Sequence, residues 1–418
     1  MTKRLILAFV FLSWHLVACS NGDSGISSGL PDKPSAEEDS PGTETISEEM
    51  RVKITGEDLY ISAKLDAKTD ILYWFKKCMF NELFTFYRVG TIDNNMPAPA
   101  TLPDASPTSL LNLAYSDNIG PFNITGYGWC GGNHPYLDEV TQTARNIGYR
   151  IYIDGKEIKT DLSTLTKEIK IEVINEIMNP SKADTSSGKT LLNEILCIET
   201  VNYSIYRNNI QVLVTHEFQN ESPVTVQMYY GMQSMFDKET HTLTANGKYV
   251  DWTVQKDVST FTKKEYPSFR RFIEKSANVY QSSYLFADGL GNHEEISDDD
   301  IIFIGNSNNK TYHKIIADRE HKKGDIIHWS GVYTWFKSPV SDDDDLLCYE
   351  GVIDNKKVLF IDCKKNVDRT IQLPVDYTKK SFTIIEKSKS ITITGNKVTA
   401  KGLRIVSDGS GSCVITFD

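Results

Sequence analysis

Apolar and polar residues alternate with a period of two along most of this chain. The segment "RVKITGEDLYISAKL" (51–65) shows the pattern, and "GYRIYIDGKEI" (148–158) has an Asp-Gly pair between two such runs. A period of two places successive side chains on opposite faces of a strand, and Asp-Gly is typical of a tight hairpin turn. The chain is therefore predicted to fold mainly as antiparallel β-sheet.

The number of strand-like runs predicts an all-β fold with two parts. A large antiparallel β-sandwich is expected over 51–340 and a small all-β module over 346–418. Between them lies "SDDDD" (341–345), for which a solvated turn is favoured over a calcium site. The two helix candidates are weak: "TSLLNLAY" (108–115) and part of "SFRRFIEKSA" (268–277).

The N-terminus predicts export. Lys3 and Arg4 precede the apolar run "LILAFVFLSWHLVA" (5–18), which is too short for a membrane span and has the layout of a signal peptide. It ends in "LVAC" (16–19), which resembles the lipobox of bacterial lipoproteins, and "CSNGDSG" (19–25) resembles the start of surface lipoproteins of the Bacteroidota. The resemblance implies cleavage after residue 18, acylation of Cys19 and an outer-membrane, cell-surface location; the alternative is an ordinary secretory signal.

Residues 19–50 are predicted to be a disordered tether. They are rich in Ser, Gly, Pro, Asp and Glu and contain too few apolar residues to offset the entropy of ordering. The whole chain carries a net charge of -11, and no basic block suggests a nucleic-acid partner. Through an acylated Cys19, the membrane is an expected partner.

Six cysteines follow Cys19, and none has the spacing of a metal site. In an exported protein they could form disulfides, and Cys348 and Cys363 are the first pair to test because they lie on neighbouring strand-like runs. Buried free thiols are the default expectation for most of them. No metal or cofactor motif is present in the sequence, so neither is predicted.

The segment "GYGWCGGNHPY" (126–136) is the first candidate site. Gly131 and Gly132 allow positive φ angles or a close backbone approach, and Pro135 favours an extended conformation at His134. Such a loop is predicted to project Asn133 and His134 into a cleft. The expected walls of that cleft are Trp129 and Tyr136. The alternative is a glycine-rich corner in which His134 only satisfies backbone groups.

A second set of candidates follows on later strands. His216 in "VLVTHEF" shares a face with two valines, so it is either a buried core histidine or a residue of a concave site. In "VQMYYGMQ", Tyr229 has polar or small same-face neighbours and is expected to face a cleft with Gln233 close by, while Tyr230 is expected on the opposite face. Arg270, next to Arg271, is a candidate for binding a carboxylate, although a pair of surface arginines is the favoured interpretation.

The phrases "VTHEFQNESPVTVQMYYGMQ" (214–233) and "HWSGVYTWF" (328–336), within this β-rich layout, resemble the galactose-mutarotase-like supersandwich of carbohydrate-active proteins. The resemblance implies a glycan substrate. The residue types match a polysaccharide lyase that cleaves uronic-acid polymers by β-elimination, with the predicted catalytic set Asn133, His134, His216, Tyr229 and Arg270. Trp129, Tyr136 and Gln233 would bind the sugar. The alternative is a non-catalytic glycan-binding or adhesive surface lipoprotein.

Overall fold

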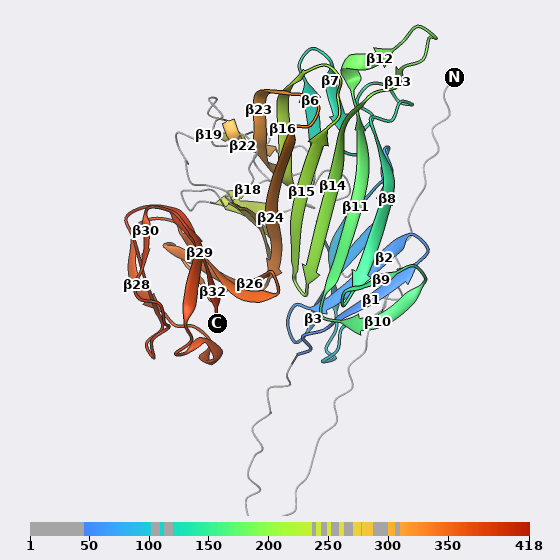
Figure 1. Cartoon of the computed structure of the whole chain (residues 1–418). Helices are drawn as coiled ribbons and strands as arrows, with labels where there is room; N and C mark the ends of the chain where they lie inside the picture. Colours follow the sequence, from blue (N-terminus) through green and yellow to red (C-terminus); the bar gives the residue numbers. More distant parts are fainter. Residues whose placement is uncertain are drawn as a thin grey trace, which may run out of the picture. The chain divides into compact units, whose positions relative to one another are not determined.

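The computed structural model describes residues 46–101, 109–112, 120–235, 240–243, 249–251, 259–262, 271–276, 278–286, 300–305 and 310–418. Residues Thr45–Asp418 form one compact unit built from β-strands (Figure 1). The predicted all-β, antiparallel fold is confirmed, because every pairing of described strands is antiparallel. The predicted signal peptide, Cys19 and most of the tether lie outside the described residues.

The first sheet contains the N-terminal strands in the order β10-β1-β2-β3-β4-β5. Five of its strands, β1 to β5, follow one another as antiparallel neighbours, and β10 pairs with β1 from further along the chain. Their bounds are β1 Met50–Thr55, β2 Asp58–Lys64, β3 Thr69–Cys78, β4 Leu83–Asp93, β5 Ser109–Asn112 and β10 Leu162–Thr166.

The largest sheet has ten described strands in the order β18-β17-β20-β21-β24-β15-β14-β11-β8-β9. Long strands at its centre explain the long alternating runs of the sequence. Their bounds are β8 Ala144–Ile153, β9 Lys156–Ile158, β11 Ile169–Met178, β14 Ile195–Tyr206, β15 Asn209–Phe218, β17 Thr240–Leu243, β18 Tyr249–Asp251, β20 Arg271–Ser276, β21 Val279–Leu285 and β24 Ile326–Phe336.

A third sheet has the order β19-β22-β23-β16-β6-β7. Its strands are β6 Pro121–Ile124, β7 Gly128–Gly131, β16 Val224–Met235, β19 Ser259–Thr262, β22 Asp300–Gly305 and β23 Lys310–His321. Beside these sheets lie the short pair β12 Ala183–Asp184 and β13 Leu191–Leu192 and the 3-10 turn η1 Pro180–Lys182.

The first and third sheets share one hydrophobic core with the ten-stranded sheet. Strand β24 shows the arrangement: Trp335 packs against Tyr73 of the first sheet at 5.2 Å between ring centroids, while Trp329 donates a hydrogen bond to Tyr229 of the third sheet at 2.8 Å. Two smaller sheets thus cover different parts of one large sheet. This is a sandwich whose single core runs under both covering sheets.

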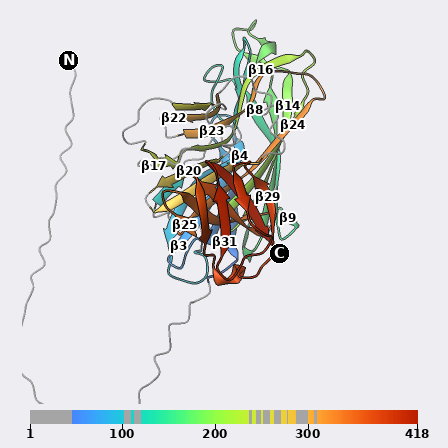
Figure 2. The same ribbon diagram turned by 90° about the vertical axis from the view of Figure 1, so that its left-hand side faces the viewer.

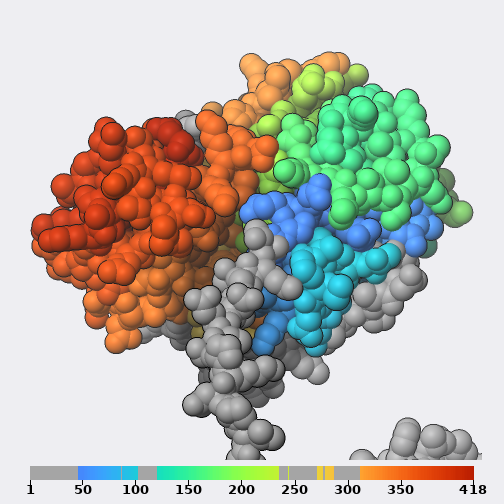
Figure 3. Space-filling view, turned by 90° about the horizontal axis from the view of Figure 1, so that it is seen from below, coloured from blue at the N-terminus to red at the C-terminus, as the bar shows by residue number. Residues whose placement is uncertain are grey.

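Residues after β24 form a compact module with two small sheets, visible in front in Figure 2 and as a continuous orange-to-red surface in Figure 3. Its own core is lined by Leu346, Leu359, Ile405 and Ile415 among others. The strands are β25 Ser341–Asp342, β26 Leu346–Ile353, β27 Lys356–Cys363, β28 Val367–Ile371, β29 Phe382–Lys387, β30 Ile391–Ile393, β31 Leu403–Ser407 and β32 Gly411–Phe417, with the 3-10 turn η3 Val375–Tyr377.

A second apolar cluster joins this module to the ten-stranded sheet. Phe336 of β24 stacks on Tyr349 of β26 at 4.3 Å between centroids, and Arg271 of β20 forms a buried ion pair with Asp362 of β27. The predicted boundary near 341–345 therefore separates two cores that also share an interface, and the division into domains stays a prediction. Three of the four carboxylates of "SDDDD" pair with cations, including Asp343 with Arg369 at 2.6 Å.

Both helix predictions are wrong. Within "TSLLNLAY" the described residues form β5, and the described part of "SFRRFIEKSA" includes β20, because each segment pairs with neighbouring strands. The six cysteines between Cys78 and Cys413 are buried free thiols. Cys348 and Cys363 are therefore not joined: they lie on paired strands, but Cys348 is opposite Ile361. Among the described residues no helix is long and apolar enough to cross a membrane.

Candidate functional site

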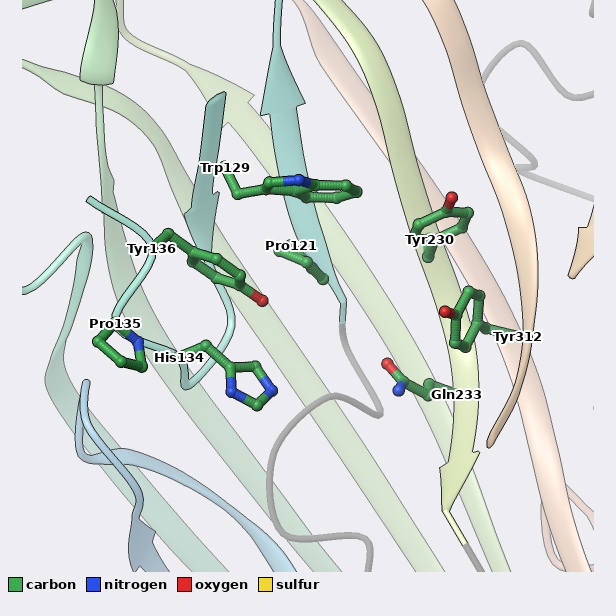
Figure 4. A pocket seen from close by; sticks show the side chains of 8 residues that line it. All are labelled: Pro121, Trp129, His134, Pro135, Tyr136, Tyr230, Gln233 and Tyr312. Carbon is green, nitrogen blue, oxygen red and sulfur yellow. The ribbon is translucent and has the colours of Figure 1, made fainter. Parts of the chain in front are cut away.

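A cavity of about 460 Å³ opens at the third sheet, beside the loop that follows β7. Figure 4 shows His134 and Tyr136 on one side, Tyr230, Tyr312 and Gln233 on the other, and Trp129 at one end. This volume lies within the range of small-ligand sites in proteins, about 300–1,000 Å³. We call this cavity the aromatic cleft; it is lined by Pro121, Trp129, His134, Pro135, Tyr136, Tyr230, Gln233 and Tyr312.

The loop on one side of the cleft takes its shape from two glycines. Gly131 has a φ of 79° and Gly132 a φ of 55°, as the sequence predicts, and both lie in a region that residues with a Cβ rarely adopt. The chain therefore turns sharply at the end of β7. The turn directs His134, Pro135 and Tyr136 toward the cleft.

Asn133 connects this loop by hydrogen bonds to the segment between β3 and β4. It is 1% exposed, its side-chain oxygen accepts a hydrogen bond from the backbone N–H of Leu83 at 3.2 Å, and its backbone oxygen accepts one from Phe80. Asn81 donates to the backbone oxygen of Gly132 at 2.7 Å. The prediction that Asn133 projects into the cleft is therefore wrong, because its amide is committed to the turn between β3 and β4.

Three rings of the cleft have similar orientations. The ring of Trp129 lies 6.2 Å from that of Tyr136 with an interplanar angle of 29°, and 5.9 Å from that of Tyr230 with an angle of 22°. Tyr312 contacts Tyr230 at 4.6 Å between centroids. The imidazole of His134 lies at 5.6 Å from Tyr136. The cleft thus offers aromatic faces together with an imidazole and an amide.

The prediction for the two tyrosines of "VQMYYGMQ" is wrong: each lies on the face that was predicted for the other. Val224, Val226 and then Tyr229 are buried, so the inward positions change from even to odd numbers within β16. The pairing of β16 with β6 shifts between Val226 and Met228, and such a bulge moves the residues directly after it to the opposite face. Tyr230 therefore lines the cleft, while Tyr229 lies in the core.

Tyr229 and His216 belong to a buried network under the third sheet. Both are 0% exposed, and their rings meet at 4.9 Å between centroids. The Nε2 of His216 is hydrogen-bonded to Glu199 at 2.9 Å, and Glu199 also accepts a bond from Asn175. Burial raises the pKa of Tyr229 far above its ordinary value. The predicted site that unites His134 with His216 and Tyr229 is therefore wrong, since neither of the latter lines the cleft.

The remaining predicted residues divide into two groups. The structure brings Trp129, His134, Tyr136 and Gln233 to the aromatic cleft, and their roles stay predictions. Arg270 lies outside the described residues, and the adjacent Arg271 is buried in its ion pair with Asp362. Within the described part of the chain, no group of three or more His, Cys, Asp or Glu side chains is placed to hold a metal ion.

Sequence reasoning missed Tyr312 and assigned Tyr230 to the wrong face. Tyr312 alternates with polar neighbours in β23, and no local pattern relates it to β16. It reaches the cleft because β23 pairs with β16, a strand about eighty residues earlier in the chain. Only that long-range pairing places the two tyrosines together.

No protein-family model matches this chain, and no curated protein matches it significantly. Among solved structures it is similar to a GH36 α-galactosidase from Geobacillus stearothermophilus, with 8% identity and a TM-score of 0.41 over 69% of this chain and 41% of that enzyme. A glycoside hydrolase family 97 enzyme from Pseudoalteromonas sp. strain K8 has 6% identity and a TM-score of 0.35, over 70% of this chain and 37% of that enzyme. A polysaccharide lyase has 8% identity and a TM-score of 0.27, over 82% of this chain and 45% of that lyase.

This chain therefore spans less than half the length of each of these three proteins. Likeness at this level assigns neither an activity nor a substrate to this chain.

Proposed function

We propose that the aromatic cleft binds a glycan and that this chain is a carbohydrate-active protein. The observation that carries the proposal is the set of four large aromatic side chains around a cavity of about 460 Å³, next to the imidazole of His134 and the amide of Gln233. Aromatic faces stack on the apolar faces of sugar rings, while a few convergent polar groups fix the orientation of a ligand.

The finer proposal is β-elimination on a uronic-acid polysaccharide. His134 or a tyrosine of the cleft would remove the proton α to the sugar carboxylate, and the amide of Gln233 would donate a hydrogen bond to that carboxylate as negative charge develops. The bond between the ring carbon and the leaving oxygen then breaks, a carbon–carbon double bond forms, and a second tyrosine protonates the leaving oxygen. The shared cleft of His134, Tyr230, Tyr312 and Gln233 supports this proposal.

Binding without chemistry is the second candidate. The cleft is lined by aromatic rings, two prolines, one imidazole and one amide. This composition is sufficient for recognition of a sugar by stacking and hydrogen bonds. The chain would then act as a glycan-binding or adhesive surface protein.

One experiment separates these proposals: the purified chain is incubated with uronic-acid and neutral polysaccharides. Binding is measured by affinity electrophoresis, and elimination by the ultraviolet absorbance of the unsaturated product. Trp129→Ala should weaken binding at least about tenfold, the equivalent of roughly 1.4 kcal/mol. The matched control is Tyr127→Ala, which removes an exposed ring from the same hairpin outside the cleft.

Three results decide between the candidates. Equal affinities for the two variants, or no binding to any glycan, would overturn the proposal that the cleft binds sugars. New absorbance that falls roughly 10²–10⁴-fold in His134→Ala would support elimination. Binding with no new absorbance would support the non-catalytic candidate.

We also propose that Cys19 anchors the chain in the outer membrane and that the body faces the cell surface. The "LVAC" sequence at 16–19 supports this proposal. Acyl chains contribute about 0.8 kcal/mol per buried methylene, so a multiply acylated cysteine binds a membrane stably. Cys19→Ala should move the protein from the membrane fraction to the soluble fraction, and retention of the uncleaved variant in the membrane would contradict the proposal.

A further inference from the structure

The outer face of the first sheet carries a row of cationic and aromatic side chains. Lys53, Tyr60, Trp74 and Arg88 lie directly opposite one another on β1, β2, β3 and β4. The neighbours of Lys53, Tyr60 and Trp74 along their strands face the core, whereas Tyr87, next to Arg88, contacts Trp74 because the pairing of β3 with β4 shifts there. Neighbouring strands are about 4.8 Å apart, so the row extends about 14 Å across the sheet.

The rings of this row form a preorganised cluster with Tyr87. Tyr60 stacks on Trp74 at 5.3 Å with an angle of 26°, and Tyr87 meets Trp74 edge-on at 4.9 Å. The indole N–H of Trp74 donates to Asp58 at 2.8 Å. All three rings are half-buried, so part of each remains accessible. Rings held in this way lose little conformational entropy when a ligand packs on them.

Basic side chains surround the cluster. The ammonium of Lys76 lies 4.5 Å from the ring centre of Trp74 and 4.1 Å from that of Tyr87. The guanidinium of Arg88 lies 4.8 Å from the ring of Tyr87 and donates to its hydroxyl. The Nε of Arg88 is buried and has no hydrogen-bond partner among the described residues. Three cations, Lys53, Lys76 and Arg88, thus outnumber the carboxylate of Asp58 around the cluster, on a chain whose net charge is -11.

We propose that this outer face is a second binding site, separate from the aromatic cleft, for an anionic polysaccharide. Sugar rings pack on the cluster of Tyr60, Trp74 and Tyr87, and the carboxylates or sulfates of the polymer pair with the flanking cations. An arginine guanidinium binds a carboxylate through two parallel hydrogen bonds, and opposite charges across an interface favour the matching partner.

A linear polymer fits this face better than a lipid surface does. The cluster rings are half-buried within the sheet, and Asp58 fixes Trp74, so the rings do not project as they would to enter a membrane. The row is straight because it follows the cross-strand register. An extended ligand can therefore contact all four strands at once.

The test uses the full chain carrying Trp129→Ala, which weakens the aromatic cleft so that the remaining binding reports on the outer face. Affinity for polygalacturonate is measured by calorimetry, with dextran as the neutral comparison. We expect binding to polygalacturonate that weakens as salt rises. Lys53→Glu, and Lys76→Glu combined with Arg88→Glu, should each weaken it at least about tenfold, because a repelling charge replaces an attracting one.

Lys323→Glu is the matched control, since it makes the same charge change at an exposed lysine in the turn between β23 and β24. Thermal unfolding verifies that each variant is folded. If the double variant of Lys76 and Arg88 does not fold, the affinity of Lys53→Glu for polygalacturonate alone tests the proposal. Lys53 lies at the end of the row.

The proposal is overturned by any of four results. The first is unchanged affinity in Lys53→Glu. The second is an equal loss in Lys323→Glu. The third is stronger binding to vesicles of anionic phospholipid than to polygalacturonate. The fourth is binding of polygalacturonate to the unmodified chain but not to the Trp129→Ala chain, which excludes the outer face while it supports binding in the aromatic cleft.

Discussion

Replacing His216 with alanine should destabilise the fold, whereas replacing His134 should not. His216 is 0% exposed, and its Nε2 is 2.9 Å from the carboxylate of Glu199, which is 1% exposed. Alanine would leave Glu199 in the core with Asn175 as its remaining hydrogen-bond partner among those described. It would also leave a cavity beside Phe122 and Tyr229, whose rings contact the imidazole.

The expected loss follows from the burial of both partners. Removing the imidazole leaves a buried oxygen of Glu199 without this hydrogen bond, which costs about 1–3 kcal/mol, and the cavity left by the ring adds to that loss. The total free energy of unfolding of a protein is about 5–15 kcal/mol, so this loss is a large fraction of it. His134 is half-buried at the cleft, and a substitution there should change the unfolding free energy by no more than about 0.5 kcal/mol.

The measurement is urea unfolding of both variants, followed by tryptophan fluorescence. A double-mutant cycle with Glu199→Gln isolates the interaction, and the two substitutions together should cost less than the sum of their separate effects. The reasoning is refuted if His216→Ala unfolds within about 0.5 kcal/mol of the unmodified chain. It is equally refuted if His134→Ala destabilises the protein as much as His216→Ala.

Two further predictions concern stability. Gly120 and Gly126 both have positive φ, but a Cβ at Gly120 would lie 1.7 Å from the backbone oxygen of Tyr230, whereas one at Gly126 meets nothing within 4 Å. Gly120→Ala should therefore cost about 1–3 kcal/mol more than Gly126→Ala in urea unfolding, and equal costs would contradict this. Burial raises the pKa of Glu274 from 4.5 to about 8. Its contribution to the free energy of unfolding is therefore complete below about pH 4.5 and is lost as the pH rises toward 8. Over that range the free energy of unfolding should fall by up to about 1.4 kcal/mol per pH unit. Glu274→Gln should remove that slope, and an unchanged pH dependence of unfolding would show that Glu274 is not its cause.

Local patterns predicted the strands where the alternation was regular. "RVKITGEDLYISAKL" becomes β1 and β2, and "GYRIYIDGKEI" becomes β8 and β9 joined at Asp154 and Gly155, both with positive φ. Period two and turn chemistry depend on neighbouring residues, so they can be read from the sequence. The two segments predicted as helices failed because pairing with adjacent strands overrides weak local preference.

The face that each residue presents was less predictable. In β16 one shift in pairing between Val226 and Met228 exchanges the environments of Tyr229 and Tyr230. A bulge of this kind leaves no clear trace in the sequence, since the apolar residues on both sides still alternate. The same limit applies to Asn133, whose amide is used by Leu83, a residue fifty positions earlier.

Local sequence is enough to predict that this chain is all-β and that the loop after Trp129 turns at two glycines, because both properties arise from the residues concerned and their immediate neighbours. Which side chains meet depends instead on the tertiary structure. The aromatic cleft takes Trp129 from β7, Tyr230 from β16 and Tyr312 from β23. These strands adjoin only through long-range pairing, whose partners and register depend on how all the sheets bury their apolar faces together.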